Sequence, residues 1–125
     1  MDQSKGQIED VLAKKATVFY REVFGVGPKE AKSYILDDMI IIRLLTNLLP
    51  IEKKLLTKYK GVELVKNLRQ NLHDATINEV SKIIKEITGQ TIISAHSDIS
   101  TKTGEIFEVF ILNENYEDKL KQRNL

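Results

Sequence analysis

Apolar residues recur every three or four positions in the first part of the chain, which is the spacing of one helix face. Ser4 and Gln7 precede this stripe as an S-x-x-Q capping box, a pattern that marks the start of a helix. The sequence therefore predicts a helix that begins after Ser4 and ends near Phe24. Its apolar face consists of Ile8, Val11, Leu12, Ala16, Phe19, Tyr20 and Val23.

Two pairs of short segments rich in β-branched residues predict two β-hairpins. In the first pair, KSYIL and MIIIRLL flank the acidic turn Asp37-Asp38. In the second pair, TIISAHSD and EIFEVFIL flank residues 100–104. Aspartate tolerates left-handed backbone geometry, so the acidic turn is compatible with a tight hairpin.

The segment between the hairpins has the spacing of two helices. Pro50 suits the first turn of a helix that runs to about Tyr59, and Gly61 separates it from a longer one. The longer helix has an apolar stripe over residues 65–87, and Gly89 stands where a C-terminal cap is expected.

The order α-β-β-α-α-β-β predicts a two-layer α+β fold, with helices on one face of a four-stranded, largely antiparallel sheet. In MIIIRLL and EIFEVFIL both alternating sets of side chains are largely apolar, whereas a sheet with one wet face should alternate more cleanly. A second subunit is the simplest cover for the other face, so we predict a homodimer. We expect one domain over residues 1–113 and a charged tail or loose helix over residues 114–125.

Composition argues against several classes of protein. The chain has 125 residues, which fits one domain, and its net charge of +1 provides no global field to attract nucleic acid. It contains no cysteine, and therefore no disulfide or thiolate metal site. No apolar run approaches the ~18 residues of a membrane span, and the N-terminus lacks a signal-peptide core. We therefore expect a cytoplasmic protein without direct membrane insertion.

The stretch HSDISTKTGE, residues 96–105, gathers most of the candidate ligand-binding groups. Its hydroxyls, lysine and turn N–H groups suit a small anion such as phosphate, carboxylate or bicarbonate. The same residue types are also ordinary in an exposed hairpin turn. An anion-binding loop and a polar turn both remain open. The turn residues concerned are Ser100, Thr101, Lys102, Thr103 and Gly104.

His96 and Asp98 lie two residues apart on one strand face, where a carboxylate can orient an imidazole for proton transfer. Alternatively, His96 is a polar residue on a partly buried strand face. The other histidine, His73, lies beside Asp74 on the long helix, and joining the two pairs into a metal site would need a fortuitous fold. We therefore assign no catalytic residue, metal or cofactor.

The stretch FGVGPKEAK invites comparison with phosphate-binding loops. Such loops follow a strand and precede a helix, whereas these glycines follow a predicted helix and precede a strand. We therefore assign Gly25, Gly27 and Pro28 to a structural turn. Lys29 would edge an anion pocket if this turn lay near Lys102.

Two longer segments, GVGPKEAKSYILDDMIIIRLL and SAHSDISTKTGEIFEVFIL, resemble a small bacterial family known as MpsC-like. The first contains the family's G-x-GPK-x-x-(K/S) turn and its Y-I-(I/L)-x-D-M-I-I-(I/V)-R-L hairpin. The second contains its H-(S/T)-D-(I/V)-(S/N)-x-x-(T/S)-(G/N)-E segment. The resemblance covers roughly residues 5–113. It implies that the two polar loops form one functional surface, with motif positions at Gly27, Pro28, Lys29, His96, Asp98, Thr103 and Gly104.

The family name implies an accessory part in a sodium-translocating, membrane-potential-generating system, and similar systems are linked to inorganic carbon uptake. The first hypothesis is therefore a non-enzymatic accessory or regulatory module that acts as a homodimer, with a membrane protein as partner. The second hypothesis is a small-anion binding protein that uses residues 100–104. The third is an enzyme that uses His96 as base and Asp98 as its orienting group.

Overall fold

The helices and strands follow the predicted order, with one further helix after the second hairpin. The structure is a computed structural model, and it describes residues 3–123. The elements are α1 (Lys5–Phe24), β1 (Glu30–Leu36), β2 (Met39–Leu45), α2 (Pro50–Leu55), α3 (Gly61–Thr88), β3 (Ile92–Ile99), β4 (Glu105–Leu112) and α4 (Tyr116–Arg123).

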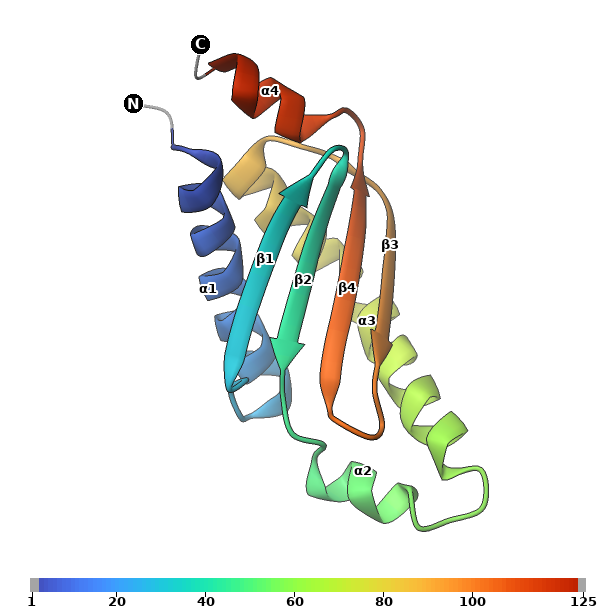
Figure 1. Cartoon of the computed structure of the whole chain (residues 1–125). Coiled ribbons are helices and arrows are strands. Elements are labelled where there is room, and N and C mark those ends of the chain that lie inside the picture. The colour runs from blue at the N-terminus through green and yellow to red at the C-terminus, as the bar shows by residue number, and fades with distance from the viewer. Residues whose placement is uncertain (1–2, 124–125) are drawn as a thin grey trace.

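The strands form a four-stranded antiparallel sheet in the order β1-β2-β4-β3, so the two hairpins join along β2 and β4 (Figure 1). At the centre of the sheet Glu108 lies between Ile42 on β2 and Ser97 on β3. Both long helices, α1 and α3, lie behind the sheet in Figure 1. The predicted α+β class, with helices on one face of an antiparallel sheet, is therefore confirmed.

The core lies between these two helices and the face of the sheet that they cover, here called the inner face. Along β2 every second residue is buried, which turns Ile40, Ile42 and Leu44 inward. Leu12 of α1 and Ile84 of α3 belong to the same buried cluster. Burying one such side chain contributes about 1.5–3 kcal/mol, so this layer is the main stabilising part of the fold.

The predicted ends of the two long helices are confirmed. The Ser4 hydroxyl accepts the Gln7 N–H at 3.2 Å, and the Gln7 side chain accepts the Ser4 N–H at 2.8 Å. Gly25 and Gly89 follow the last helical residues with φ of 79° and 73°, in the left-handed region that glycine adopts without a Cβ clash.

The predicted end of the short helix is wrong, since α2 stops at Leu55 and not near Tyr59. A turn follows, in which Lys60 has a φ of 59°. Gly61 then starts α3 against this turn, and a Cβ at Gly61 would overlap the carbonyl oxygen of Leu55. The reversal between α2 and α3 therefore depends on close backbone approach, which hydrophobic spacing does not reveal.

The charged tail contains α4, which packs into the core through Tyr116 and Leu120, both 2% exposed. Glu117 fixes its position, because its carboxylate lies 2.7 Å from the Lys5 ammonium and accepts the Asp37 N–H at 3.1 Å. The apolar residues that pack α4 on the core are these two, four positions apart. A pair of apolar residues is a weak sequence signal, so the packing of α4 was hard to predict.

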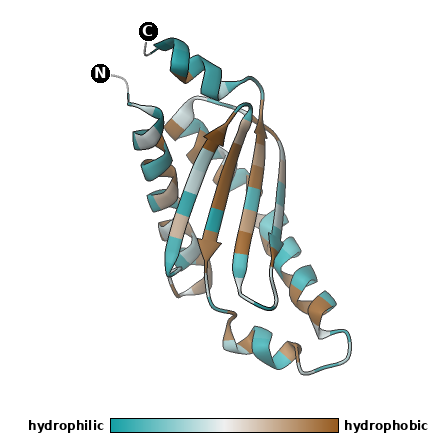
Figure 2. Cartoon of the chain, in the orientation of Figure 1, coloured by the Kyte–Doolittle hydropathy of each residue, from teal (hydrophilic) through white to brown (hydrophobic). Residues whose placement is uncertain are grey.

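The opposite face of the sheet, here called the outer face, is covered by neither α1 nor α3 (Figure 1). Apolar residues dominate it near the β1–β2 turn, and β2 is hydrophobic over most of its length (Figure 2). Tyr34, Leu36 and Phe107 are between 39% and 46% exposed. Its side chains form four rows across the strands: Leu36, Met39, Ile111 and Ser94; Tyr34, Ile41, Val109 and His96; Lys32, Arg43, Phe107 and Asp98; and Glu30, Leu45 and Glu105.

Candidate functional site

A cavity of about 320 Å³ lies between α1, α3 and the inner face of the sheet. Much of its lining is apolar, because the hydrophobic stripes of both helices contribute to it. Phe19 contributes from α1, Val80 and Ile83 from α3, and Ile42 and Phe110 from the sheet. The volume lies within the roughly 300–1,000 Å³ of small-molecule pockets, so this cavity is the candidate functional site.

Glu108 on β4 faces this cavity from the middle of the sheet, and Asp98 on the edge strand β3 also contributes to its lining. Glu108 stands in the inward set of β4 with Ile106 and Phe110, and its side chain is 21% exposed. Burial raises its pKa to about 7, because the surrounding apolar side chains disfavour the charged form. At neutral pH the carboxyl group is therefore divided between its protonated and ionised forms.

The nearest charged or ionisable partner of Glu108 is His73 on α3. His73 Nδ1 lies 3.8 Å from Glu108 Oε2, which is too long for a hydrogen bond. Ser97 is the cross-strand neighbour of Glu108 on β3 and also lines the cavity. An acid, an imidazole and a hydroxyl thus lie close together in the lining of the cavity.

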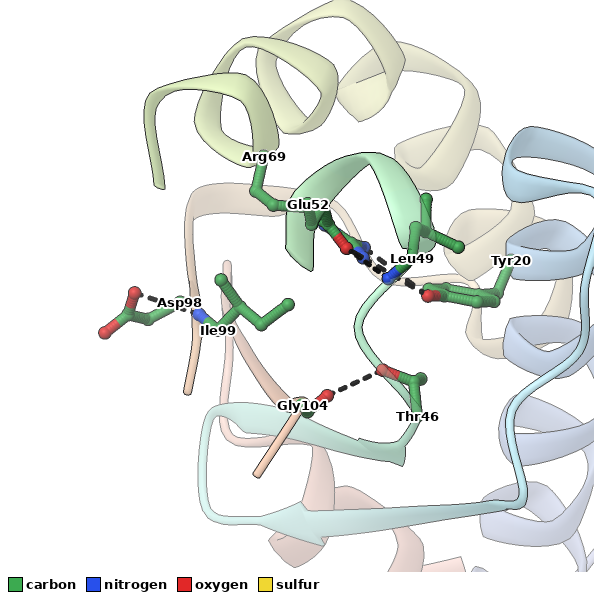
Figure 3. A network of polar contacts seen from close by, with 8 residues as sticks. All are labelled: Tyr20, Thr46, Leu49, Glu52, Arg69, Asp98, Ile99 and Gly104. Atoms are coloured by element: carbon green, nitrogen blue, oxygen red, sulfur yellow. Dashed lines mark hydrogen bonds and ion pairs between the residues drawn. The ribbon is translucent and has the colours of Figure 1, made fainter. Parts of the chain in front are cut away.

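Arg69 contributes to the cavity lining. It also joins α3 to α2 (Figure 3). Its Nε and Nη2 lie 2.5 and 2.7 Å from the two carboxylate oxygens of Glu52. Its guanidinium carbon lies 4.2 Å from the centre of the Phe24 ring, and its amino groups lie 3.4 and 3.5 Å from the Tyr20 hydroxyl. Arg69 is therefore a structural anchor whose charge is already neutralised.

Glu52 is fully buried, with no exposed side-chain surface. Burial works to raise its pKa, but the bonds from Arg69 and from the Leu49 N–H outweigh burial and hold the pKa below its ordinary value. Burial likewise works against the charge of Arg69, and the bonds to Glu52 and Tyr20 raise its pKa. Both groups are ionised at neutral pH, and neither is free to bind a ligand.

The turn at residues 100–104 uses its hydroxyls internally. The Ser100 hydroxyl accepts the N–H groups of Lys102 and Thr103 at 3.3 and 3.2 Å, and the Thr103 hydroxyl accepts the Glu105 N–H at 3.2 Å. Thr101 is partly buried and Lys102 is exposed. The N–H groups best placed to hold an anion are thus already bonded, and anion binding here stays a prediction.

Gly104 also has a structural part in this turn. Its φ is 80°, and its carbonyl oxygen accepts the Thr46 hydroxyl at 2.6 Å (Figure 3). A Cβ at Gly104 would overlap the Thr46 carbonyl oxygen, so the β3–β4 turn packs directly on the connection from β2 to α2.

His96 and Asp98 lie on the outer face at the sheet edge, and they are not bonded to each other. The Asp98 carboxylate accepts hydrogen bonds from the Lys66 ammonium group at 3.0 Å and from the Ile99 N–H at 2.9 Å. The hydrogen bond from Lys66 lowers the pKa of Asp98. Asp98 therefore orients toward α3 and not toward the imidazole of His96.

Lys29 lies at the same end of the sheet as the turn at residues 100–104. Its N–H donates to the Leu45 carbonyl at 2.7 Å, and Leu45 pairs with Glu105 on its other side. Strand β2 thus separates Lys29 from the β3–β4 turn by about 10 Å, two strand spacings. The preceding residues form the turn after α1: Gly25 caps the helix, and Gly27 and Pro28 lead into β1.

Sequence reasoning did not single out the cavity acid, although a signal was present. Glu108 is the charged residue in the alternating set Ile106, Phe110 and Leu112, which the fold turns inward. A charge within an inward-facing set marks a buried ionisable group. His73 could not be assigned to it, because the distance between α3 and β4 depends on tertiary packing.

Residues 3–123 offer neither a metal-binding cluster nor a membrane-spanning helix. No group of three or more histidine, aspartate or glutamate side chains in this range is arranged to hold a metal ion. None of the helices within it is long and apolar enough to cross a membrane.

Comparisons with known proteins point to one family. A family profile described as a Na+-translocating membrane potential-generating system (MpsC) matches residues 4–114. The uncharacterized protein YbcI of Bacillus subtilis (strain 168) is 35% identical over 122 residues, which span 98% of this chain and 98% of the relative. No solved structure matches the chain.

Proposed function

The chain belongs to the MpsC family, and from this premise we propose that it is a non-enzymatic accessory module of a sodium-linked membrane system, acting as a homodimer. The observation that carries the proposal is the uncovered apolar outer face of the sheet. An exposed apolar patch rimmed by polar residues is typical of an interaction site. The family description supplies the membrane system.

The strand order allows the outer face to pair with itself. A two-fold axis parallel to the strands, between β2 and β4, places β1 over β3 of the second copy and β2 over its β4. Stacked sheets pack about 10 Å apart, which suits interdigitating aliphatic side chains. In this arrangement each row meets the same row of the second copy, so apolar rows cover apolar rows.

The charged row is complementary under the same operation. Lys32 on β1 meets Asp98 of the second copy, and the contact occurs twice because of the symmetry. In the single chain Lys32 pairs with Glu30 at 3.5 Å and Asp98 with Lys66 at 3.0 Å. Lys32 is 48% and Asp98 71% exposed, so both are exposed ion pairs that contribute little, and each side chain can exchange its partner across the interface. Arg43 on β2 meets Phe107 of the second copy, and a guanidinium over an aromatic ring is attractive. This complementarity favours a second copy over an unrelated protein as the occupant.

The membrane role is tested in bacterial cells that lack the gene, by following sodium-dependent membrane potential with a voltage-sensitive dye. We expect the potential to fall in these cells and wild-type protein to restore it. Val109→Lys places a charge at the centre of the outer face and should fail to restore the potential. Val18→Lys, on the exposed side of α1, is the matched control and should restore it.

Two results would overturn the proposal. An unchanged sodium-dependent potential in cells without the gene would remove the membrane role. Full restoration by Val109→Lys would show that the outer face is dispensable for that role.

A further inference from the structure

The cavity behind the sheet contains an acid without a hydrogen-bond partner. Within residues 3–123, no group donates a hydrogen bond to the Glu108 carboxyl, and His73 Nδ1 remains 3.8 Å away. The Glu108 side chain is 21% exposed, so its carboxyl stays accessible from the cavity. The carboxyl faces an open apolar volume of about 320 Å³, where a ligand group has room to approach it.

The other charged groups that line this cavity do not neutralise the Glu108 carboxylate. Arg69 is paired with Glu52, and Lys66 with Asp98. Lys15 lies on α1, where it is exposed to solvent. The ionisable residues that line the cavity beside Glu108 are Lys15 and Tyr20 on α1, Lys66, Arg69 and His73 on α3, and Asp98 on β3.

We propose that this cavity binds a small organic amine, with its ammonium group against Glu108 and its hydrocarbon body between α1 and α3. A protonated amine supplies both the positive charge and the hydrogen-bond donors that the Glu108 carboxyl lacks. The aliphatic walls of α3 and the ring of Phe19 bury the hydrocarbon body, which removes apolar surface from water.

This assignment is independent of the dimer. The cavity lies on the inner face of the sheet, whereas the proposed subunit contact lies on the outer face. A monomeric chain would bind the amine equally well, so failure of one proposal leaves the other standing.

The proposal is tested with hexylamine, hexanol and hexanoate, which share one hydrocarbon body and differ in the head group. Binding is followed by amide chemical shifts in a nitrogen-15 NMR titration at pH 7. We expect hexylamine to shift amides along α1, α3 and β4 and to bind about tenfold more tightly than hexanol, as one added charge-assisted contact implies. Glu108→Gln should reduce its affinity to that of hexanol.

Two control variants separate Glu108 from other causes. Glu79→Gln removes an acid from the exposed side of α3 and should leave hexylamine binding unchanged. His73→Asn removes the imidazole. Because ammonium binding ionises Glu108, the affinity should fall about fivefold from pH 7 to pH 6, and should still do so in His73→Asn.

Four outcomes would overturn the proposal. Equal or tighter binding of hexanoate would assign the cavity to fatty acids, and equal binding of hexanol would assign it to neutral apolar molecules. Retained hexylamine binding in Glu108→Gln would exclude the carboxyl as its partner. Cavity amides that change with protein concentration but with none of the three probes would indicate a second copy as the occupant.

Discussion

Arg69 on α3 and Glu52 on α2 form a bidentate ion pair, in which two guanidinium nitrogens lie 2.5 and 2.7 Å from the two carboxylate oxygens. The Glu52 side chain is fully buried, and it also accepts the Leu49 N–H at 2.9 Å at the start of α2. One carboxylate therefore caps α2 and ties it to α3. Arg69 also lines the cavity, so this contact holds one of its lining side chains in place.

Breaking this pair from one side should be strongly destabilising. Arg69→Met leaves the Glu52 carboxylate buried without its counter-charge, and we expect a loss of about 3–5 kcal/mol in the free energy of unfolding. The double variant Arg69→Met, Glu52→Met should recover most of the loss, because no buried charge remains. Urea unfolding followed by circular dichroism measures both values. A double variant as unstable as the single one would show that packing, and not the charge, is what Arg69 supplies.

Glu108 should make stability fall as pH rises. Its pKa is about 7 in the folded chain and 4.5 without burial, so folding favours the protonated form. Below pH 4.5 the carboxyl does not lower the free energy of unfolding. Between pH 4.5 and pH 7 it lowers this free energy progressively, and above pH 7 the loss is constant at about 3 kcal/mol, from ~1.4 kcal/mol per pKa unit.

The isosteric variant Glu108→Gln removes this titration. It should match wild type in stability near pH 4 and exceed it at pH 8. Urea unfolding at a series of pH values makes the comparison, with Glu79→Gln as the surface control. A constant difference between Glu108→Gln and wild type across this range would contradict the assigned pKa.

Hydrophobic spacing predicted helices α1 to α3 and the two hairpins, because these depend on local sequence. The order of the elements predicted that the helices lie on one face of the sheet. The Ser4 cap and Gly89 fix helix ends through bonds and dihedral angles of neighbouring residues. The end of α2 was wrong because it depends on backbone contact at Gly61. The docking of α4 depends on Tyr116 and Leu120 packing into the core, and the spacing of two apolar residues indicates this only weakly.

The candidate site was less predictable than the fold. The sequence drew attention to HSDISTKTGE because polar residues are concentrated there, yet its hydroxyls largely stabilise the turn itself. The cavity acid is one residue in an apolar strand, and its unusual environment comes from helices that lie far away in the sequence. Concentrated polar residues are visible in a sequence, whereas desolvation of a single group is a property of the packed structure.

Gly104→Ala should destabilise the protein more than Gly25→Ala. Both glycines have positive φ, at 80° and 79°, so both substitutions add about 1 kcal/mol of backbone strain. Only at Gly104 does the new Cβ also overlap the backbone of Thr46, whereas nothing lies within 4 Å of it at Gly25. Thermal unfolding of the two variants makes the comparison. Equal midpoints would show that the β3–β4 turn can move away from Thr46 freely.

Anion binding at the turn requires its own measurement. A thermal-unfolding screen with bicarbonate and phosphate is expected to show stabilisation that Lys102→Ala removes. An anion at 100 times its dissociation constant should add about 2.7 kcal/mol. No shift with either anion would leave the turn as a structural element of the hairpin.

The most direct test of the account is a charge exchange across the outer face, read by sedimentation equilibrium. Wild type should be dimeric. Lys32→Asp and Asp98→Lys should each weaken dimerisation about tenfold, because an exposed ion pair contributes roughly 0.2–1 kcal/mol and each reversal affects two symmetric contacts. The double variant, which restores opposite charges across the axis, should regain much of the affinity. A monomeric wild type, or a double variant no better than the singles, would contradict the proposed dimer.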